Sequence, residues 1–308
     1  MSTLVGGPTG PEQPGALSRA ERAAIRQCLL AVSVVHDIDM LPTDDGVILV
    51  GATADGVTTV GVPDIDVSLD DIASAVGDAD AHSAVAHLRA YRWLEARRAI
   101  AERSLDELAE IARPVALPVG HELHPGATWV RQSVLGGCLD MGLGFAGLHR
   151  DRPDAVVVVP TSVLAAAGID ASLWWAAATE YLENMGALAT TRWRREPRGP
   201  LRPMGDCDVI TLLASAVFRG ALCADAGGMR AIAAPVRTRG WLDLSRIDPA
   251  FAQTAAAIAD DESRGFPRPL LLTVDEVTMV SDGGHPAEIV LRDPAVERSH
   301  WLSEVLYH

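Results

Sequence analysis

The chain of 308 residues carries 41 acidic and 26 basic residues, which gives a formal net charge of −15, and 48% of its residues are hydrophobic. This acidic balance argues against diffuse binding to nucleic acid or to an anionic membrane surface. None of the basic residues is lysine, which excludes lysine Schiff bases, covalently bound pyridoxal phosphate and a P-loop lysine. The four cysteines lie far apart and form no CxxC pair, so we expect a cytoplasmic protein with free, buried thiols.

The chain is expected to begin with a flexible lead-in and to contain no membrane segment. Residues 1–17 are rich in glycine and proline and lack the basic and apolar regions of a signal peptide. The longest mostly apolar run, residues 155–169, is interrupted by Pro160 and falls short of the roughly 20 residues that a membrane span needs. We therefore expect a soluble protein.

Helix-capping patterns and one hairpin pattern occur within residues 18–113, which we expect to form an acidic α+β part. A serine followed three residues later by an acidic residue indicates a helix start, and Asp-Gly between two β-rich runs favours a type I′ hairpin turn. In chain order we expect a helix over residues 18–35, a hairpin over 46–62 that turns at Asp55–Gly56, a helix capped by Ser68, a helix over 82–103 with Val85, Leu88, Tyr91 and Leu94 on one face, and a helix capped by Ser104 that ends at Pro114.

Residues 114–308 are expected to form a second α+β part. Aspartate followed by proline marks helix starts, and a run of valines indicates a buried strand. In chain order we expect a strand within 154–162, a helix capped by Asp170 that carries Leu173, Ala177, Tyr181, Met185 and Leu188 on its apolar face and ends near Gly186, a helix over 208–224, a strand within 229–241, a helix from Pro249, a hairpin of 268–280 with 287–293, and a terminal helix from Pro294.

The predicted elements mix hairpins and helices without a steady β-α alternation. This order favours an α+β fold of mixed antiparallel hairpins and helices over a doubly wound parallel sheet. Proline and glycine cluster at residues 114–125 and 193–206, where a boundary between two sub-domains would fall. We place the boundary at the first cluster, which divides the chain into residues 1–17, 18–113 and 114–308.

The stretch GHELHPGATWVRQSVLGGCLDMGLGF, residues 120–145, holds the first candidate site. His121 and His124 are three residues apart and are candidate metal ligands, with a third ligand from Cys138, Asp140 or His149. The alternative is that both histidines are polar loop residues before a glycine-rich buried segment. Asp140 and His121 are candidate catalytic residues, because a carboxylate among apolar neighbours must find partners or shift its pKa.

Three further motifs carry competing structural explanations. The GxGxxG at residues 142–147 lacks the following helix that a dinucleotide site needs, so close packing of small residues explains it. Aspartates two apart at residues 37–39 and 64–66 suit a divalent cation or are solvated loop residues. Cys207 is a candidate catalytic thiol at a helix start, although the aspartates on both sides raise a thiol pKa, and helix capping alone explains them.

Charge is segregated along the chain. Between Arg26 and Arg89 the sequence has eleven aspartates and no arginine, whereas residues 192–202 hold five arginines. Guanidinium groups bind carboxylates and phosphates bidentately, but these arginines could also pair with the acidic region of the same protein. The candidate ligand-binding residues are Arg192, Arg194, Arg195, Arg198 and Arg202, followed by Arg237 and Arg239 of a second group beside Trp241.

Our leading hypothesis is a binding or regulatory protein that uses this arginine-rich surface to hold an anionic ligand or an acidic protein partner, without a cofactor. The pair Trp174–Trp175 favours an interface for self-association, because aromatic residues are enriched at interfaces. The alternative is a hydrolase or transferase, with or without a divalent metal ion, whose pocket lies around His121, His124 and Asp140. A third hypothesis is that the protein is a scaffold of a larger assembly. The sequence does not decide among these three functions, so it leaves open whether the protein is an enzyme.

Overall fold

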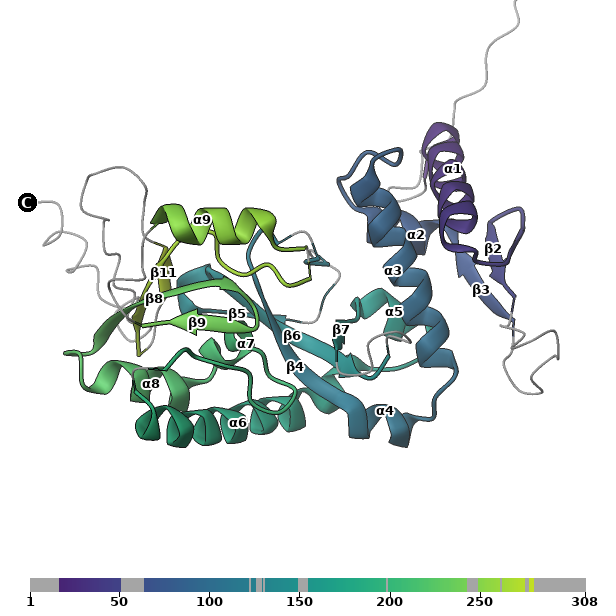
Figure 1. Cartoon of the computed structure of the whole chain (residues 1–308). Coiled ribbons are helices and arrows are strands. Elements are labelled where there is room, and N and C mark those ends of the chain that lie inside the picture. The colour runs from purple at the N-terminus through teal and green to yellow at the C-terminus, as the bar shows by residue number, and fades with distance from the viewer. Residues whose placement is uncertain are drawn as a thin grey trace, which may run out of the picture. The chain divides into compact units, whose positions relative to one another are not determined.

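The computed structural model has an α+β fold with antiparallel sheets, as the sequence predicts (Figure 1). The chain divides into two compact units, Met1–Leu94 and Glu95–His308, and the division falls inside helix α3 (Ala84–Ala101). The structure describes residues 17–50, 64–121, 123–125, 129, 131–148, 155–197, 199–242, 249–260, 262–274 and 277–279.

The first part of the proline and glycine cluster at residues 114–125, where the sequence places a boundary, lies in a strand. Pro114 and Pro118 lie within β4 (Ala112–Pro118), which pairs with β6 (Leu139–Ala146) at one edge of its sheet. An edge strand tolerates proline because one side of the strand needs no ladder hydrogen bonds. The sequence boundary at 113/114 therefore differs from the division into compact units.

The first unit combines three helical segments with a small antiparallel sheet. Ser18 and Glu21 form a capping box at the start of the first helix, and the Ser68 hydroxyl accepts from the backbone N–H of Asp71 as predicted. The predicted turn at Asp55–Gly56 lies outside the described residues. The elements are α1 (Arg19–His36), β1 (Met40–Pro42), β2 (Gly46–Leu49), β3 (Ile65–Ser68), α2 (Leu69–Val76) and the first part of α3, and the sheet order is β1-β2-β3.

The buried face of α3 differs from the predicted one. Val85 is 43% exposed, whereas Ala86, Ala90 and Trp93 are buried. Apolar residues occur around much of this helix, so periodicity alone does not identify the inner face. The core packs against alanines, which allow a close approach, and of the four predicted residues only Leu94 is fully buried.

The first sheet of the second unit is built around β6, whose residues are buried along nearly its whole length. Its glycines fall in the strand interior, and a Cβ added at Gly142 would lie 2.1 Å from the Trp129 ring. The GxGxxG motif is therefore a site of close packing, not a phosphate loop. The remaining strands are β5 (Arg131–Val134) and β7 (Val156–Val158), both antiparallel to β6. The short η2 (Leu135–Gly137) connects β5 to β6, α4 (Leu105–Ile111) precedes β4, and α5 (Thr161–Ala166) follows β7.

The second sheet of this unit has helices on both faces. In Figure 1, α9 (Pro249–Ile258) lies on one side of β8 (Met229–Val236), and α8 (Ala216–Ala224) lies on the other. β8 is therefore buried over consecutive residues. The predicted strand 268–280 is itself a hairpin, and 287–293 lies outside the described residues. The sheet order is β11-β10-β8-β9, with β9 (Arg239–Trp241), β10 (Leu270–Thr273) and β11 (Val277–Met279).

The inner face of the long helix α6 (Trp175–Arg195) matches the predicted one only in part. Tyr181 and Met185 pack against the core as predicted, but Leu188 and Leu173, which lies before the helix in η3, do not. Leu173 and Leu188 are 68% and 51% exposed.

Gly186 lies in the helix interior against Ser215, because only a glycine fits there. Ser215 caps α8, so the predicted helix 208–224 is two helices, α7 (Val209–Leu213) and α8. Asp170 caps the short η3 (Ala171–Trp174) that leads into α6, and the buried face of α6 consists of Ala178, Leu182, Gly186, Ala189, Thr190 and Trp193.

Candidate functional site

Asp140 is a buried carboxylate with two basic partners. It lies in β6 and is 5% exposed. Its Oδ2 atom is 2.8 Å from Nε2 of His124 and 2.8 Å from Nε of Arg131, which lies on the neighbouring strand β5. A buried charge needs such partners. The structure thus brings together two residues of the predicted pocket, and Arg131 is a partner that the sequence did not identify.

His121 has a separate set of partners. Its Nδ1 atom accepts from the backbone N–H of Leu123 at 3.1 Å, and its Nε2 atom lies 3.1 Å from the carbonyl oxygen of Arg264. A carbonyl can only accept, so Nε2 carries the proton and the ring is neutral. Both nitrogens are therefore occupied, and His121 offers no lone pair to a metal ion in this arrangement.

The two histidines lie in a turn, where His121 is buried and His124 is partly buried. Backbone hydrogen bonds from His121 to Pro118 and from His124 to His121 fold the segment tightly after β4. The His124 ring meets the Trp129 ring edge-on, with the ring centroids 5.3 Å apart. Within the described part of the chain, no group of three His, Cys, Asp or Glu side chains could hold a metal ion; His149 falls outside that part.

Cys207 is fully buried next to two carboxylates. Burial raises the pKa of the Cys207 thiol to about 12, and Asp208 and Asp206 shift it in the same direction, while Arg113 opposes them. The thiolate is the nucleophilic form of cysteine. The thiol is therefore protonated at neutral pH, which does not favour the predicted catalytic role.

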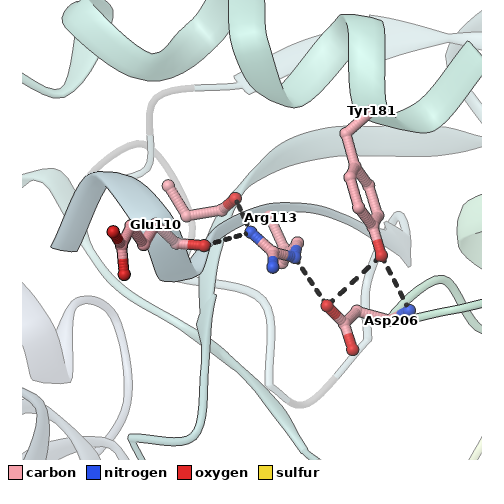
Figure 2. A network of polar contacts seen from close by, with 5 residues as sticks. Glu110, Arg113, Tyr181 and Asp206 are labelled. Carbon is pink, nitrogen blue, oxygen red and sulfur yellow. Dashed lines mark hydrogen bonds and ion pairs between the residues drawn. The ribbon is translucent and has the colours of Figure 1, made fainter. Parts of the chain in front are cut away.

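Asp206, one of the two aspartates beside Cys207, has structural partners (Figure 2). The Arg113 Nε atom donates to Asp206 at 2.5 Å, and its Nη1 atom donates to the carbonyl oxygens of Glu110 and Ala112. Tyr181 donates its hydroxyl hydrogen to the Asp206 carboxylate at 3.3 Å and accepts from the Asp206 backbone N–H at 3.2 Å. Burial raises the pKa of Tyr181. This network ties β4, α6 and the loop before α7 together.

Four described arginines form what we call the arginine surface: Arg192, Arg194 and Arg195 in the last turn of α6, and Arg202 after it. Arg192 donates through Nη2 to the carbonyl oxygens of Arg202 and Pro203, at 2.5 and 2.8 Å. Arg194, Arg195 and Arg202 are exposed, and none of them has a carboxylate partner among the residues that the structure describes. Arg198 lies outside those residues.

The two arginines of the second predicted group, Arg237 and Arg239, differ in their surroundings. The Arg237 Nε atom donates at 2.5 Å to Asp208, whose other oxygen caps α7, so Arg237 is already neutralised. Arg239 is exposed on β9, with no carboxylate partner in the described ranges. Arg230 places its guanidinium carbon 5.4 Å from the centre of the Trp193 ring, a contact between β8 and α6 that the sequence did not predict.

A small pocket opens at the arginine surface. Its volume open to the centres of water molecules is about 40 Å³, far below the roughly 300–1,000 Å³ of typical small-molecule sites. The sequence identified its arginines through composition but not its apolar wall, which other elements supply. The lining residues are Ala189, Arg192, Trp193, Glu196, Pro200, Leu201, Arg202 and Phe218.

Comparison with known protein families, with curated proteins and with solved structures finds no match for this chain. Among the described helices, none combines the length and the apolar character needed to cross a membrane.

Proposed function

We propose that the protein is a binding protein whose arginine surface holds the anionic groups of an acidic partner through noncovalent contacts. The observation that supports this most is the exposure of Arg194, Arg195 and Arg202 without a carboxylate partner in the described part of the chain. Guanidinium groups bind carboxylates with two parallel hydrogen bonds, which gives geometric specificity.

The charge of the whole protein sets the range of this binding. A net charge of −15 repels anions at long distance. At physiological salt, exposed charges are screened beyond about 8 Å, so an anionic group that reaches the arginine surface meets mainly the local guanidiniums. Binding should therefore be short-ranged, salt-sensitive and dependent on several arginines at once.

A structural explanation of the same arginines must be tested beside this proposal. Arg192, Arg194 and Arg195 stand in the last turn of α6, where cations are favourable because the C-terminal end of a helix carries partial negative charge. If this were their only role, their removal would weaken the helix end and leave ligand affinity unchanged.

The test measures binding of a fluorescent oligoglutamate peptide to the full chain by anisotropy. We expect Arg194→Ser with Arg195→Ser to lower the affinity about fivefold or more, because each exposed ionic contact contributes up to about 1 kcal/mol. Arg19→Ser with Arg22→Ser removes the same charge from α1 and serves as the control. Equal affinities in the two double variants would contradict the proposal.

One observation favours the enzyme as a second candidate. The Asp140 carboxylate lies 2.8 Å from Nε2 of His124, and a carboxylate on an imidazole can orient it as a general base. The same oxygen also accepts from Arg131, and the His124 side chain is only 10% exposed. Stoichiometric zinc or manganese in the purified protein, lost in His124→Ala, would favour a metal-dependent hydrolase or transferase over the binding protein.

A further inference from the structure

One face of α1 packs into the core, and the opposite face is exposed although it carries apolar residues. Leu30 and Val34 are 66% and 76% exposed. At about 3.6 residues per turn, they lie on the side of the helix opposite its buried residues, which are Ile25, Cys28, Leu29 and Val32. The outer face of a helix in a globular protein is normally polar, so this apolar face needs an explanation.

The exposed face has the spacing of a helix pair. Its residues follow one another at alternating steps of three and four positions, as the a and d positions of a coiled coil do. We call them the α1 seam: Ala20, Ala23, Gln27, Leu30 and Val34, each of which is exposed. Because the core already holds the other face of α1, the helix is formed before a partner binds, and pairing does not have to order it.

Side-chain size makes the α1 seam complementary to itself in one direction. Its alanines lie in the N-terminal half of α1, and Leu30 and Val34 lie in the C-terminal half. In an antiparallel pair whose two-fold axis lies between Gln27 and Leu30, Ala23 faces Val34 of the second copy, so a small residue meets a large one. The two Gln27 residues then lie about 4.5 Å apart along the helix axis, where each amide can donate to the other. A parallel pair would place alanine opposite alanine.

The charges at the two ends of α1 favour the same direction. Arg19 and Asp37 are both exposed, and neither forms an ion pair among the residues that the structure describes. The antiparallel pair brings Arg19 of each copy beside Asp37 of the other, whereas a parallel pair brings like charges together. Such charges at the edge of a helix pair set its orientation. A second copy of the chain is therefore complementary to the seam in both size and charge.

We propose that two copies of the chain associate through the α1 seam as an antiparallel helix pair. The inference goes beyond the proposed function, because the seam shares no residue with the arginine surface. One pair of 18-residue helices makes a small interface, so we expect a reversible dimer whose fraction rises with protein concentration. Since the contact is mainly apolar, the dimer should persist at high salt, which distinguishes it from association through the arginine surface.

Sedimentation velocity of the full chain tests the surface, over a hundredfold range of protein concentration in about 0.5 M sodium chloride. We expect Leu30→Glu with Val34→Glu to raise the dissociation constant of the dimer about tenfold or more, because both carboxylates would be buried against apolar residues. Circular dichroism shows whether this variant is folded. The control is Leu173→Glu with Ile258→Glu, which changes apolar residues outside α1 that are 68% and 80% exposed and should leave the dimer unchanged.

Disulfide formation tests the direction of the pair. A chain with Ala23→Cys and another with Val34→Cys are oxidised separately and as a mixture, and dimers are detected on a non-reducing gel. We expect a cross-link only in the mixture, because the antiparallel pair places position 23 opposite position 34. Identical positions lie about 16 Å apart along the axis, which is too far for a disulfide. The unsubstituted chain, with its four cysteines, gives the background.

Three outcomes would overturn the proposal. A monomer at every concentration would show that the α1 seam does not bind a second copy. A dimer that Leu30→Glu with Val34→Glu leaves intact would form through another surface, and cross-linking of either cysteine chain by itself would indicate a parallel pair. Oligoglutamate binding tests the arginine surface separately, so the two proposals can fail independently.

Discussion

At the scale of single residues, Asp140 shows how a charge is kept inside a sheet. One oxygen of its carboxylate receives both His124 and Arg131, and the side chain is 7% exposed. We expect Asp140→Asn to lower the free energy of unfolding by about 2 kcal/mol, because it removes a charge-assisted hydrogen bond and leaves Arg131 without its anion. Urea denaturation measures the change.

The matched control for Asp140 is an exposed ion pair. Asp45 lies 3.2 Å from Arg22, but its side chain is 91% exposed. Asp45→Asn should therefore change the free energy of unfolding by less than about 1 kcal/mol. If both substitutions cost the same, the burial of Asp140 would not be what makes its partners important.

Cys207 gives a second prediction at this scale. The neutral thiol is favoured in the folded state because burial raises the pKa from 9.0 to about 12. Its contribution to stability is complete below pH 9 and is lost as the pH rises toward 12. At pH 8 we expect iodoacetamide to leave Cys207 unmodified in the native protein and to alkylate it in urea, as read by mass spectrometry. Rapid native alkylation would instead support the catalytic thiol predicted from the sequence.

At the scale of elements, the packing of α6 against α8 depends on a glycine in the helix interior. A Cβ at Gly186 would lie 2.1 Å from the Ser215 hydroxyl oxygen, and Ser215 in turn donates to Glu183 at 2.7 Å. We expect Gly186→Ala to destabilise the fold by about 1–3 kcal/mol through overpacking, although alanine is the better helix former. Chemical denaturation measures this loss.

Gly220 in α8 is the control for this prediction. A Cβ there would meet no atom within 4 Å. Gly220→Ala should stabilise the protein by up to about 1 kcal/mol, because it gains helix propensity without a clash. A stabilising Gly186→Ala would mean that the two helices do not pack as closely as described.

Local signals account for the elements that could be predicted from the sequence. Ser68 and Ser104 each form the predicted cap, because a cap depends on residues within one turn of the helix. The inner faces of α3 and α6 could not be predicted, since the core there packs against alanine and glycine and leaves larger residues such as Leu188 exposed. Hydrophobic periodicity gives little weight to such small residues.

The candidate sites likewise combine residues that a local sequence pattern predicts with contacts that it does not predict. The arginine surface is visible as a run in the sequence, and Asp140 stands out as a charge among apolar residues. The pairing of Arg113 with Asp206 joins residues 93 positions apart, and Arg230 reaches Trp193 from another element. No local sequence pattern predicts such contacts, because only the folded chain brings the partners together.

At the scale of the whole molecule, charge is distributed unevenly between the two compact units. The eleven aspartates between Arg26 and Arg89 belong to the first unit, and the arginine surface belongs to the second. A second copy of the chain could therefore supply the acidic partner. If so, light scattering would show a larger species at low salt that Arg194→Ser with Arg195→Ser abolishes.

The most direct test of the central proposal is the salt dependence of oligoglutamate binding to the full chain. We expect the affinity of the unsubstituted protein to fall steeply between about 50 and 200 mM sodium chloride, because salt screens exposed ion pairs. The slope should be clearly shallower in Arg194→Ser with Arg195→Ser and unchanged in Arg19→Ser with Arg22→Ser. Three identical slopes, or no binding at low salt, would contradict an anion-binding role for the arginine surface.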